Sequence, residues 1–332
     1  MDPQAFDLVR QLAASHYLVR SLHVAAELGI ADAIEDGGSP VGAIASKVEA
    51  DADALFRVLR LLASRKVFRL DGPVVSHTPA SELLRSDHPQ TLRSFVRMFG
   101  QPIQWQSAGD LQHAVKTGEA VATRIVPDGG LWGYFAANPA EGRIFGEAMV
   151  AKSSVQIADV LAAHDFSHYP HIADIGGGVG HMLRAILASN PQVTGTLFDL
   201  PAVIEEARGG GPTARLQFAA GDFFSSPLPS ADATMLMEVL HDWDDAHCAQ
   251  ILTAVRRAMP ASGKLLVIEI EMPETPGPDW PKLLDIVMLA VFAARQRTNA
   301  EYVRLLETNG FKAVKQVSTP AGMTIIEGVV RD

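Results

Sequence analysis

The chain has 332 residues, 48% of them apolar, which is enough for two domains that each bury a core. Its formal net charge of −10 at pH 7 argues against a nucleic-acid partner, because such partners normally require a basic surface. The single cysteine, Cys248, excludes an intrachain disulfide and fits a reducing, cytoplasmic location. We expect neither a signal peptide nor a membrane span, since the sequence contains no apolar run of sufficient length.

The first hundred residues are predicted to be mostly helical, with one hairpin. Apolar residues recur at helical spacing in 8–28, and Leu55, Leu59 and Leu62 fall on one face of a second helical segment. Between these segments, the dipeptide Ser39-Pro40 predicts a helix capped by Ser39 that begins at Pro40. The turn in FRLDGPVVSHT predicts a β-hairpin. Helices followed by a hairpin indicate a winged-helix domain, which we place at residues 1–106.

Residues 107–332 form the second predicted domain. Its first part, to about residue 170, is predicted to be helical and connective, with a turn-rich interruption at VPDGGLWGYFAANPAEG. Predicted strands then alternate with helices, the strands being HIADIG, VTGTLFDL, ADATMLMEVL and GKLLVIEIE. Two final strands, FKAVKQVST and MTIIEGVV, could pair antiparallel. This alternation predicts an α/β fold with a doubly wound, mainly parallel sheet.

A glycine-rich loop, DIGGGVGHM, joins a predicted buried strand to a helix. Gly176, Gly178 and Gly180 permit a tight turn and the close approach of a ligand to the backbone. A dinucleotide fingerprint has the spacing G-x-G-x-x-G, whereas His181 stands where its third glycine would be. The loop therefore favours a nucleoside without a pyrophosphate, such as S-adenosylmethionine, over NAD. A simple turn is the alternative interpretation.

Acidic residues also follow the next two predicted strands. Asp199 ends TLFD and could accept hydrogen bonds from both ribose hydroxyls, although it could equally cap a helix. In AAGDFF, Asp222 could accept from an adenine amino group and Phe223 could lie against the ring, with a turn and a core role as alternatives. Because the three features follow one another at successive strand ends, they favour an adenosyl-binding site.

The segment VLHDWDDAHC contains potential metal ligands and a potential general base. A metal site is disfavoured because His241 and Asp242 would point apart on a strand, and Asp244 or Asp245 is expected to cap the following helix. His241 lies just past a strand end, where a neutral imidazole could accept a proton near pH 7. The next strand carries Glu269 and Glu271, and a carboxylate there could hydrogen-bond the other ring nitrogen and fix the tautomer. A purely structural histidine is the alternative.

From about residue 8 to residue 330, the sequence resembles the S-adenosylmethionine-dependent small-molecule O-methyltransferases, which include plant caffeic acid O-methyltransferase and bacterial natural-product relatives. The matching motifs are DIGGGVG, LFDLP, GDFF, VLHDWDD, LLDIVML and RQRT…Y…LLETNGF. The resemblance implies a Rossmann-like catalytic domain with an antiparallel last strand. It also implies an amino-terminal winged-helix domain used for homodimerisation and not for DNA, a hydroxylated aromatic acceptor, and no metal.

The resemblance further implies roles for individual residues. His241 would be the general base, with Glu269 and Gln296 beside it. Ser153 would meet the methionine carboxylate, and the full set implied at the cofactor is Ser153, Gly176, Gly178, Asp199, Asp222, Phe223 and Met237. The residues implied at the acceptor are Met149, Asp285 and Met288, although the methionines could equally be ordinary core.

The sequence departs from the family pattern at several of these positions. Gln296 stands where relatives carry a second carboxylate, and glutamine can hydrogen-bond an imidazole but cannot stabilise imidazolium by charge. Ala293 and Ala294 replace a glycine pair, and Met237 replaces a frequent polar cofactor contact. The change at position 296 leaves open a relative that keeps the cofactor for a non-methylating reaction. A third function, a regulator that binds DNA through residues 30–85, is suggested by basic residues that could equally form the solvated face of a dimerisation helix: Arg57, Arg60, Arg65, Lys66 and Arg69.

Overall fold

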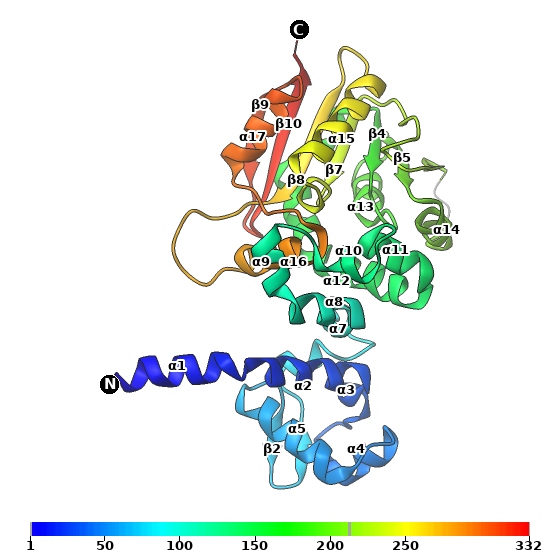
Figure 1. The fold of residues 1–332 in the computed structure, drawn as a ribbon. Helices are drawn as coiled ribbons and strands as arrows, with labels where there is room; N and C mark the ends of the chain where they lie inside the picture. The colour runs from blue at the N-terminus through cyan, green and yellow to red at the C-terminus, as the bar shows by residue number, and fades with distance from the viewer. Residues whose placement is uncertain (1, 212–213, 332) are drawn as a thin grey trace. The chain divides into compact units, whose positions relative to one another are not determined.

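The computed structural model describes residues 2–211 and 214–331, which form two compact units (Figure 1). The first unit contains the chain up to Trp105 together with Pro139–Lys152, and the second contains Gln106–Asn138 and the chain from Ser153 onwards. The predicted domain boundary between residues 106 and 107 stays a prediction.

The first unit combines helices with a small antiparallel sheet. Its apolar core includes Leu55, Leu59 and Leu62, as the helical spacing predicts. Strand β3 (Val74–Ser76) pairs with both β2 (Arg69–Asp71) and β1 (Ser39–Pro40), so the predicted hairpin is confirmed. The helices that precede Trp105 are α1 (Pro3–Ala13), α2 (Ser15–Glu27), α3 (Ile30–Ala33), α4 (Val41–Lys47), α5 (Ala52–Ser64), α6 (Pro79–Glu82) and α7 (Arg93–Gly100).

The prediction that a helix begins at Pro40 is wrong by one residue. Ser39 and Pro40 are extended because they pair with Val75 and Val74 of β3, and α4 begins at Val41. The hydroxyl of Ser39 accepts a hydrogen bond from the backbone N–H of Glu35. Because β1 pairs with β3, Ser39 does not cap the helix that its local sequence predicts.

The second unit is built on a seven-stranded sheet in the order β6-β5-β4-β7-β8-β10-β9. Its strands are β4 (His171–Ile175), β5 (Thr194–Asp199), β6 (Leu216–Ala220), β7 (Ala233–Met237), β8 (Lys264–Ile270), β9 (Phe311–Ser318) and β10 (Met323–Val330). The pairs from β6 to β8 are parallel, whereas β10 runs antiparallel to both its neighbours, which confirms the predicted fold class. The strand order reverses between β4 and β7, and ligands of such sheets bind at the carboxyl ends of the strands at this point.

Helices cover both faces of this sheet (Figure 1). Neighbouring residues of β8 show the alternation, because Leu266 packs in one apolar cluster and Val267 in the other. The first cluster includes residues of α13 (His181–Ser189), α14 (Pro201–Gly209) and α16 (Trp280–Phe292), and the second includes residues of α15 (Asp245–Ala258) and α17 (Asn299–Thr308). Among residues 2–211 and 214–331, no helix is long and apolar enough to cross a membrane.

The connection before β4 is helical, as predicted. It consists of α8 (Pro102–Gly109), α9 (Leu111–Thr117), α10 (Val121–Ile125), α11 (Gly130–Ala137) and α12 (Pro139–Ala163). The segment predicted as a turn-rich interruption is more helical than expected, since α11 and the start of α12 occupy most of it. The turn itself is short, and Gly129 and Gly130 make it with φ values of 88° and 54°.

Candidate active site

His241 lies on a short turn that follows β7. The strand ends at Met237, earlier than predicted, and Glu238 takes a left-handed conformation with φ of 52°. A 3-10 helix, Leu240–Asp242, follows and leaves His241 5% exposed. Asp244 then caps α15 by accepting a hydrogen bond of 2.8 Å from the backbone N–H of His247, which confirms the predicted cap. The turn therefore holds His241 at the carboxyl end of β7, beside the reversal in strand order.

Gln296, Glu269 and Asp242 are polar neighbours of the imidazole of His241. Nε2 of Gln296 lies 2.7 Å from Nδ1, and Oε2 of Glu269 lies 3.8 Å from the same nitrogen. On the other side of the ring, Oδ1 of Asp242 lies 3.4 Å from Nε2. The hydrogen bond predicted between Glu269 and the ring is not formed, because 3.8 Å is too long for one. Gln296 occupies that position. Asp242, considered from the sequence only as a potential metal ligand, is a neighbour of the His241 ring.

The orientation of the Gln296 amide determines which nitrogen of His241 carries the proton. If the amide NH2 donates to Nδ1, the ring proton sits on Nε2, and Oε1 of Gln296 is buried with no hydrogen-bond partner among the described residues. A 180° rotation of the amide places its oxygen opposite Nδ1, so that Nδ1–H donates to it and Nε2 keeps a lone pair. His241 can act as a base towards a ligand in the second arrangement.

Glu269 holds the turn rather than the ring. The side chain is 1% exposed, and Oε1 accepts hydrogen bonds from the backbone N–H groups of Val239 at 3.2 Å and Leu240 at 2.8 Å. Burial, reinforced by the charge of Glu238, raises the pKa of Glu269 to about 8. The carboxyl group is therefore mostly neutral at pH 7 in the ligand-free protein, and its oxygen still accepts from the turn.

This raised pKa predicts a pH-dependent stability. Between about pH 6.5 and pH 8.5 the unfolded chain has an ionised Glu269, whereas the folded chain holds the proton up to a pKa of about 8. The folded state then binds more protons, so its free energy of unfolding falls as the pH rises. We expect calorimetry of the ligand-free protein to give a lower Tm at the upper end of this range, and Glu269→Gln to reduce the slope. If Tm falls with pH equally steeply in Glu269→Gln and in the wild type, Glu269 is not the group that causes the pH dependence.

The glycine loop after β4 forms a cradle with open space in front of it. A Cβ atom added to Gly178, which has φ of 61°, would meet no heavy atom of the described chain within 4 Å. A Cβ added to Gly176 would lie 3.0 Å from Val239 and 3.8 Å from the ring of Phe223. The backbone N–H of Gly178 donates to Oδ2 of Asp199 at 2.8 Å and so ties the loop to the end of β5. The cradle therefore lies next to the turn that carries His241.

Two carboxyl groups lie at this loop, Asp174 fully buried and Asp199 half-buried. Burial raises the pKa of Asp199 to about 6, and burial together with the Asp199 charge raises the pKa of Asp174 to about 7. Asp199 also accepts a 2.7 Å hydrogen bond from the backbone N–H of Leu200, whereas both oxygens of Asp174 have no hydrogen-bond partner within the described chain. Sequence reasoning missed Asp174, although it is the first residue of the DIGGG motif.

The other residues predicted at the cofactor lie on separate elements. Asp222 follows β6, is exposed and accepts from the N–H of Phe224 at 2.9 Å. The Phe223 ring meets Trp243 edge to face, with the centroids 5.7 Å apart. Ser153 of α12 places its hydroxyl 2.6 Å from Nε2 of His181, at the start of α13. Half-buried Met237 ends β7.

The residues predicted at the acceptor differ in their surroundings. Asp285 of α16 accepts a 2.9 Å hydrogen bond from the backbone N–H of Gln296, which links α16 to the loop beside His241. Met288 is 4% exposed within the apolar core, which favours the alternative that it is ordinary core. Met149 is half-buried on α12 and belongs to the first unit. Ala293 caps the end of α16 with φ of 55°, a conformation that favours glycine, which agrees with the glycine pair that the resemblance implies at this place.

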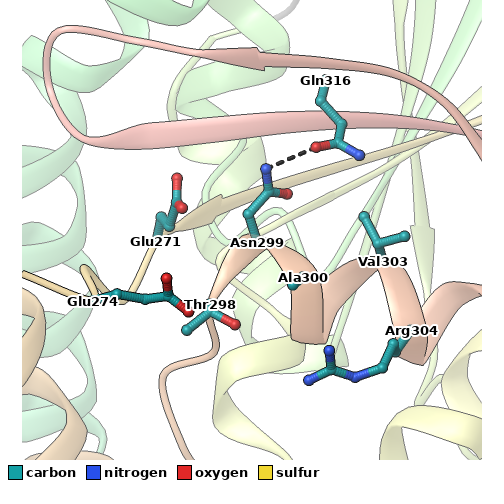
Figure 2. A pocket seen from close by; sticks show the side chains of 8 residues that line it. All are labelled: Glu271, Glu274, Thr298, Asn299, Ala300, Val303, Arg304 and Gln316. Atoms are coloured by element: carbon teal, nitrogen blue, oxygen red, sulfur yellow. Dashed lines mark hydrogen bonds between the residues drawn. The ribbon is translucent and has the colours of Figure 1, made fainter.

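A pocket of 590 Å³ lies at the start of α17 (Figure 2). All of its lining residues differ from the predicted site residues, and Asn299 donates across it to Gln316 at 2.7 Å. Among residues 2–211 and 214–331, no group of three or more His, Cys, Asp and Glu side chains could hold a metal ion.

Comparisons with known proteins identify the family. The family model for the O-methyltransferase domain matches residues 109–312, more than half of the chain, and that for the O-methyltransferase dimerisation domain matches residues 10–87. The chain belongs to the O-methyltransferase family. Phenazine O-methyltransferase PhzM of Lysobacter antibioticus is 37% identical to it over 325 residues, which cover 96% of this chain and 95% of that protein.

Solved structures of relatives agree with this family assignment. Human N-acetylserotonin methyltransferase in complex with S-adenosylmethionine matches with a TM-score of 0.91 and 29% identity, covering 100% of this chain and 99% of that one. The O-methyltransferase NcsB1 from neocarzinostatin biosynthesis, in complex with S-adenosylmethionine and 2-hydroxy-5-methyl naphthoic acid, matches with a TM-score of 0.83 and 29% identity, covering 96% and 98%. The predicted family and fold are therefore confirmed.

Proposed function

We propose that this O-methyltransferase transfers a methyl group from S-adenosylmethionine to a hydroxyl of an aromatic small molecule, with His241 as the general base. The main support is the position of His241 at the strand-order reversal, next to the glycine cradle and hydrogen-bonded through Nδ1 to Gln296 at 2.7 Å. The match to a dimerisation domain supports a homodimer formed through the amino-terminal region. A cytoplasmic location stays a prediction from the sequence.

The side chains around the glycine cradle have the hydrogen-bonding groups that S-adenosylmethionine requires. Asp199 has lone pairs left for the ribose hydroxyls after accepting from Gly178 and Leu200. Asp222 and Phe223 would hold the adenine, and Ser153 the methionine carboxylate. When bound, the cofactor supplies an electrophilic sulfonium methyl group. The protein supplies alignment and proton removal.

In the proposed mechanism, Nε2 of His241 accepts the proton of the acceptor hydroxyl. The hydroxyl oxygen is then able to take the methyl group that the cofactor would supply. The oxygen of Gln296 accepts from Nδ1–H and keeps the ring in the required tautomer. Gln296 cannot compensate the positive imidazolium by charge, but Asp242 lies 3.4 Å from Nε2 and Glu269 lies 3.8 Å from Nδ1. Because Glu269 is mostly neutral at pH 7, the carboxylate of Asp242 is the group that can supply the charge stabilisation that a carboxylate at position 296 would give.

The test is an incubation of the full-length protein with S-adenosylmethionine and a panel of phenolic, naphthol-type and phenazine-type hydroxy acids. The expected result is a product heavier by one methylene group, formed together with an equal amount of S-adenosylhomocysteine. A product that forms without S-adenosylhomocysteine would contradict methyl transfer and would favour the alternative non-methylating reaction, which the uncharged Gln296 motivates.

Gln296→Glu provides a sharper test of the base assignment. A carboxylate opposite Nδ1 accepts a hydrogen bond from Nδ1–H and stabilises imidazolium by its charge, so it makes His241 more basic. We expect turnover to be retained and the acidic limb of the pH profile of kcat to move to higher pH. A profile that stays in place in a folded variant would argue that His241 does not titrate in the reaction.

A further inference from the structure

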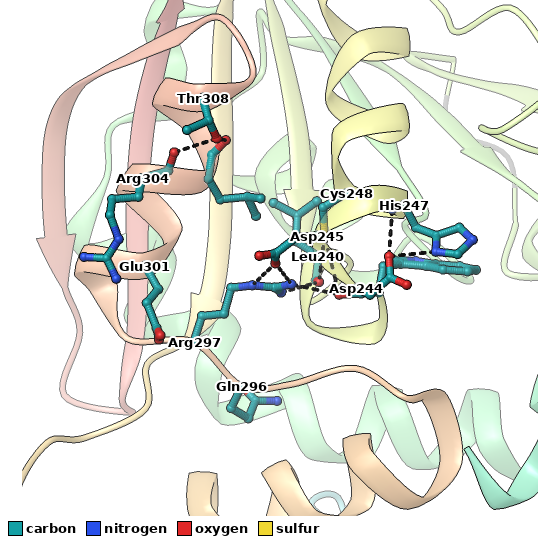
Figure 3. Close-up of polar contacts among 12 residues, drawn as sticks. Leu240, Asp244, Asp245, His247, Cys248, Gln296, Arg297, Glu301, Arg304 and Thr308 are labelled. Atoms are coloured by element: carbon teal, nitrogen blue, oxygen red, sulfur yellow. Dashed lines mark hydrogen bonds and ion pairs between the residues drawn. The ribbon is translucent and has the colours of Figure 1, made fainter. Parts of the chain in front are cut away.

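Arg297 is a fully buried arginine whose guanidinium binds the turn that carries His241 (Figure 3). The residue is 2% exposed. Its Nη1 donates to the carbonyl oxygen of Leu240 at 2.9 Å, and its Nη2 donates to that of Trp243 at 2.9 Å. Nη2 also forms an ion pair of 2.6 Å with Asp245 at the start of α15. The guanidinium therefore spans the turn from the residue before His241 to the first residue of the next helix.

The peptide groups next to His241 are thus held from two directions. Glu269 accepts the N–H of Leu240 at 2.8 Å, and Arg297 donates to the C=O of the same residue at 2.9 Å. Because His241 follows Leu240 directly, these contacts restrict the backbone that carries the imidazole. Without Arg297, the carbonyl oxygens of Leu240 and Trp243 would keep only weaker donors: the Sγ of Cys248 at 3.3 Å and 3.6 Å and, for Leu240, the N–H of Trp243 at 3.3 Å. The turn would therefore lose its charged donors, and we expect it to become less rigid.

The loop that carries Arg297 is itself fixed at both sides of that residue. The N–H of Gln296 donates to Asp285 at 2.9 Å, and the carbonyl oxygen of Arg297 accepts from the N–H of Met272 at 3.0 Å. Consecutive residues of this loop therefore contact the ring and the backbone of the same turn: Gln296 at Nδ1 and Arg297 at Leu240.

We propose that Arg297 is a positioning residue that holds the turn 240–245 so that Nε2 of His241 stays within reach of the acceptor hydroxyl. This inference rests on the proposed role of His241. The geometry requires the planar fork of arginine, because a lysine ammonium is a single point and cannot reach the carbonyls of Leu240 and Trp243 and the carboxylate of Asp245 in the same way. A misplacement of about 1 Å costs on the order of 10²-fold in rate.

The experiment compares Arg297→Lys with Arg215→Lys in the full-length protein. Arg215 is a matched control, because it also donates to backbone carbonyls, those of Leu187, Asn190 and Val193, but outside the site. We expect Arg297→Lys to lower kcat by at least about tenfold. The KM values for S-adenosylmethionine and the acceptor, and the number of S-adenosylhomocysteine sites per chain, should change little. Arg215→Lys should keep the wild-type kcat.

Hydrogen exchange tests the same point without an acceptor. We expect faster amide exchange in 239–245 of Arg297→Lys, and wild-type exchange there in Arg215→Lys. Adding guanidinium chloride at millimolar concentration to Arg297→Ala should restore part of kcat, whereas sodium chloride should not. If His241→Asn is inactive but Arg297→Lys keeps the wild-type kcat and the wild-type amide exchange, the positioning role of Arg297 is overturned and the proposed function is not. Activity that survives His241→Asn would instead overturn the proposed function.

Discussion

Replacing His241 by asparagine is expected to lower kcat by a factor of about 10² to 10⁴, the usual contribution of a positioned general base. Asparagine keeps a polar group on the turn but cannot accept the proton of the acceptor hydroxyl. The fold should persist, because Glu269 and Arg297 hold the turn through the backbone of Leu240 and not through the imidazole. Affinity for S-adenosylhomocysteine should therefore stay close to that of the wild type.

The measurement combines steady-state kinetics with calorimetric titration of S-adenosylhomocysteine. His247→Asn is the matched control, since this histidine lies on the next helix and its Nδ1 is 2.8 Å from Asp244 at the surface. We expect its kcat to stay near that of the wild type. Unchanged turnover in His241→Asn would contradict the base assignment, and a loss of S-adenosylhomocysteine binding would show that His241 acts through the cofactor site.

Local signals predicted much of the fold and some details of the site. The strands and the glycine loop follow from apolar runs bounded by glycine and acidic residues, and these features depend on neighbouring residues alone. Asp244 was a predictable cap because capping requires only the first turn of its helix. Ser39 shows the limit of such signals, because its pairing with Val75 in β3 replaced the cap that the local sequence suggested.

The partner of the His241 ring could not be predicted in the same way. Glu269 lies on the strand next to β7, which made it the obvious partner, but its carboxyl binds backbone N–H groups of the turn. Gln296 lies 55 residues from His241, in a loop whose path depends on the packing of α16 and α17. Arg297 lies in the matching motif RQRT, but its role could not be predicted, because a single arginine in a loop is normally a solvent-exposed residue.

Replacing Asp199 by alanine is expected to weaken S-adenosylhomocysteine binding by a factor of about 10 to 10³, since each hydrogen bond to a charged group contributes about 1.5–3 kcal/mol. The substitution removes the proposed acceptor of the ribose hydroxyls and also frees the N–H groups of Gly178 and Leu200. Asp232→Ala is the control, because Asp232 likewise accepts a backbone N–H, that of His171 at 2.9 Å, but at the amino ends of β4 and β7.

The protonation of Asp199 should make the affinity for S-adenosylhomocysteine fall at low pH. Burial raises its pKa to about 6 in the ligand-free protein, and only the ionised carboxylate can accept from both ribose hydroxyls without using an oxygen as a donor. Affinity should therefore be constant well above pH 6 and fall by about tenfold for each unit below it. Calorimetric titrations between about pH 5 and pH 8 should show this fall in the wild type, and Asp199→Ala should show a much flatter dependence. If the slope persists in Asp199→Ala, another acid, of which buried Asp174 is the nearest in the loop, controls cofactor binding.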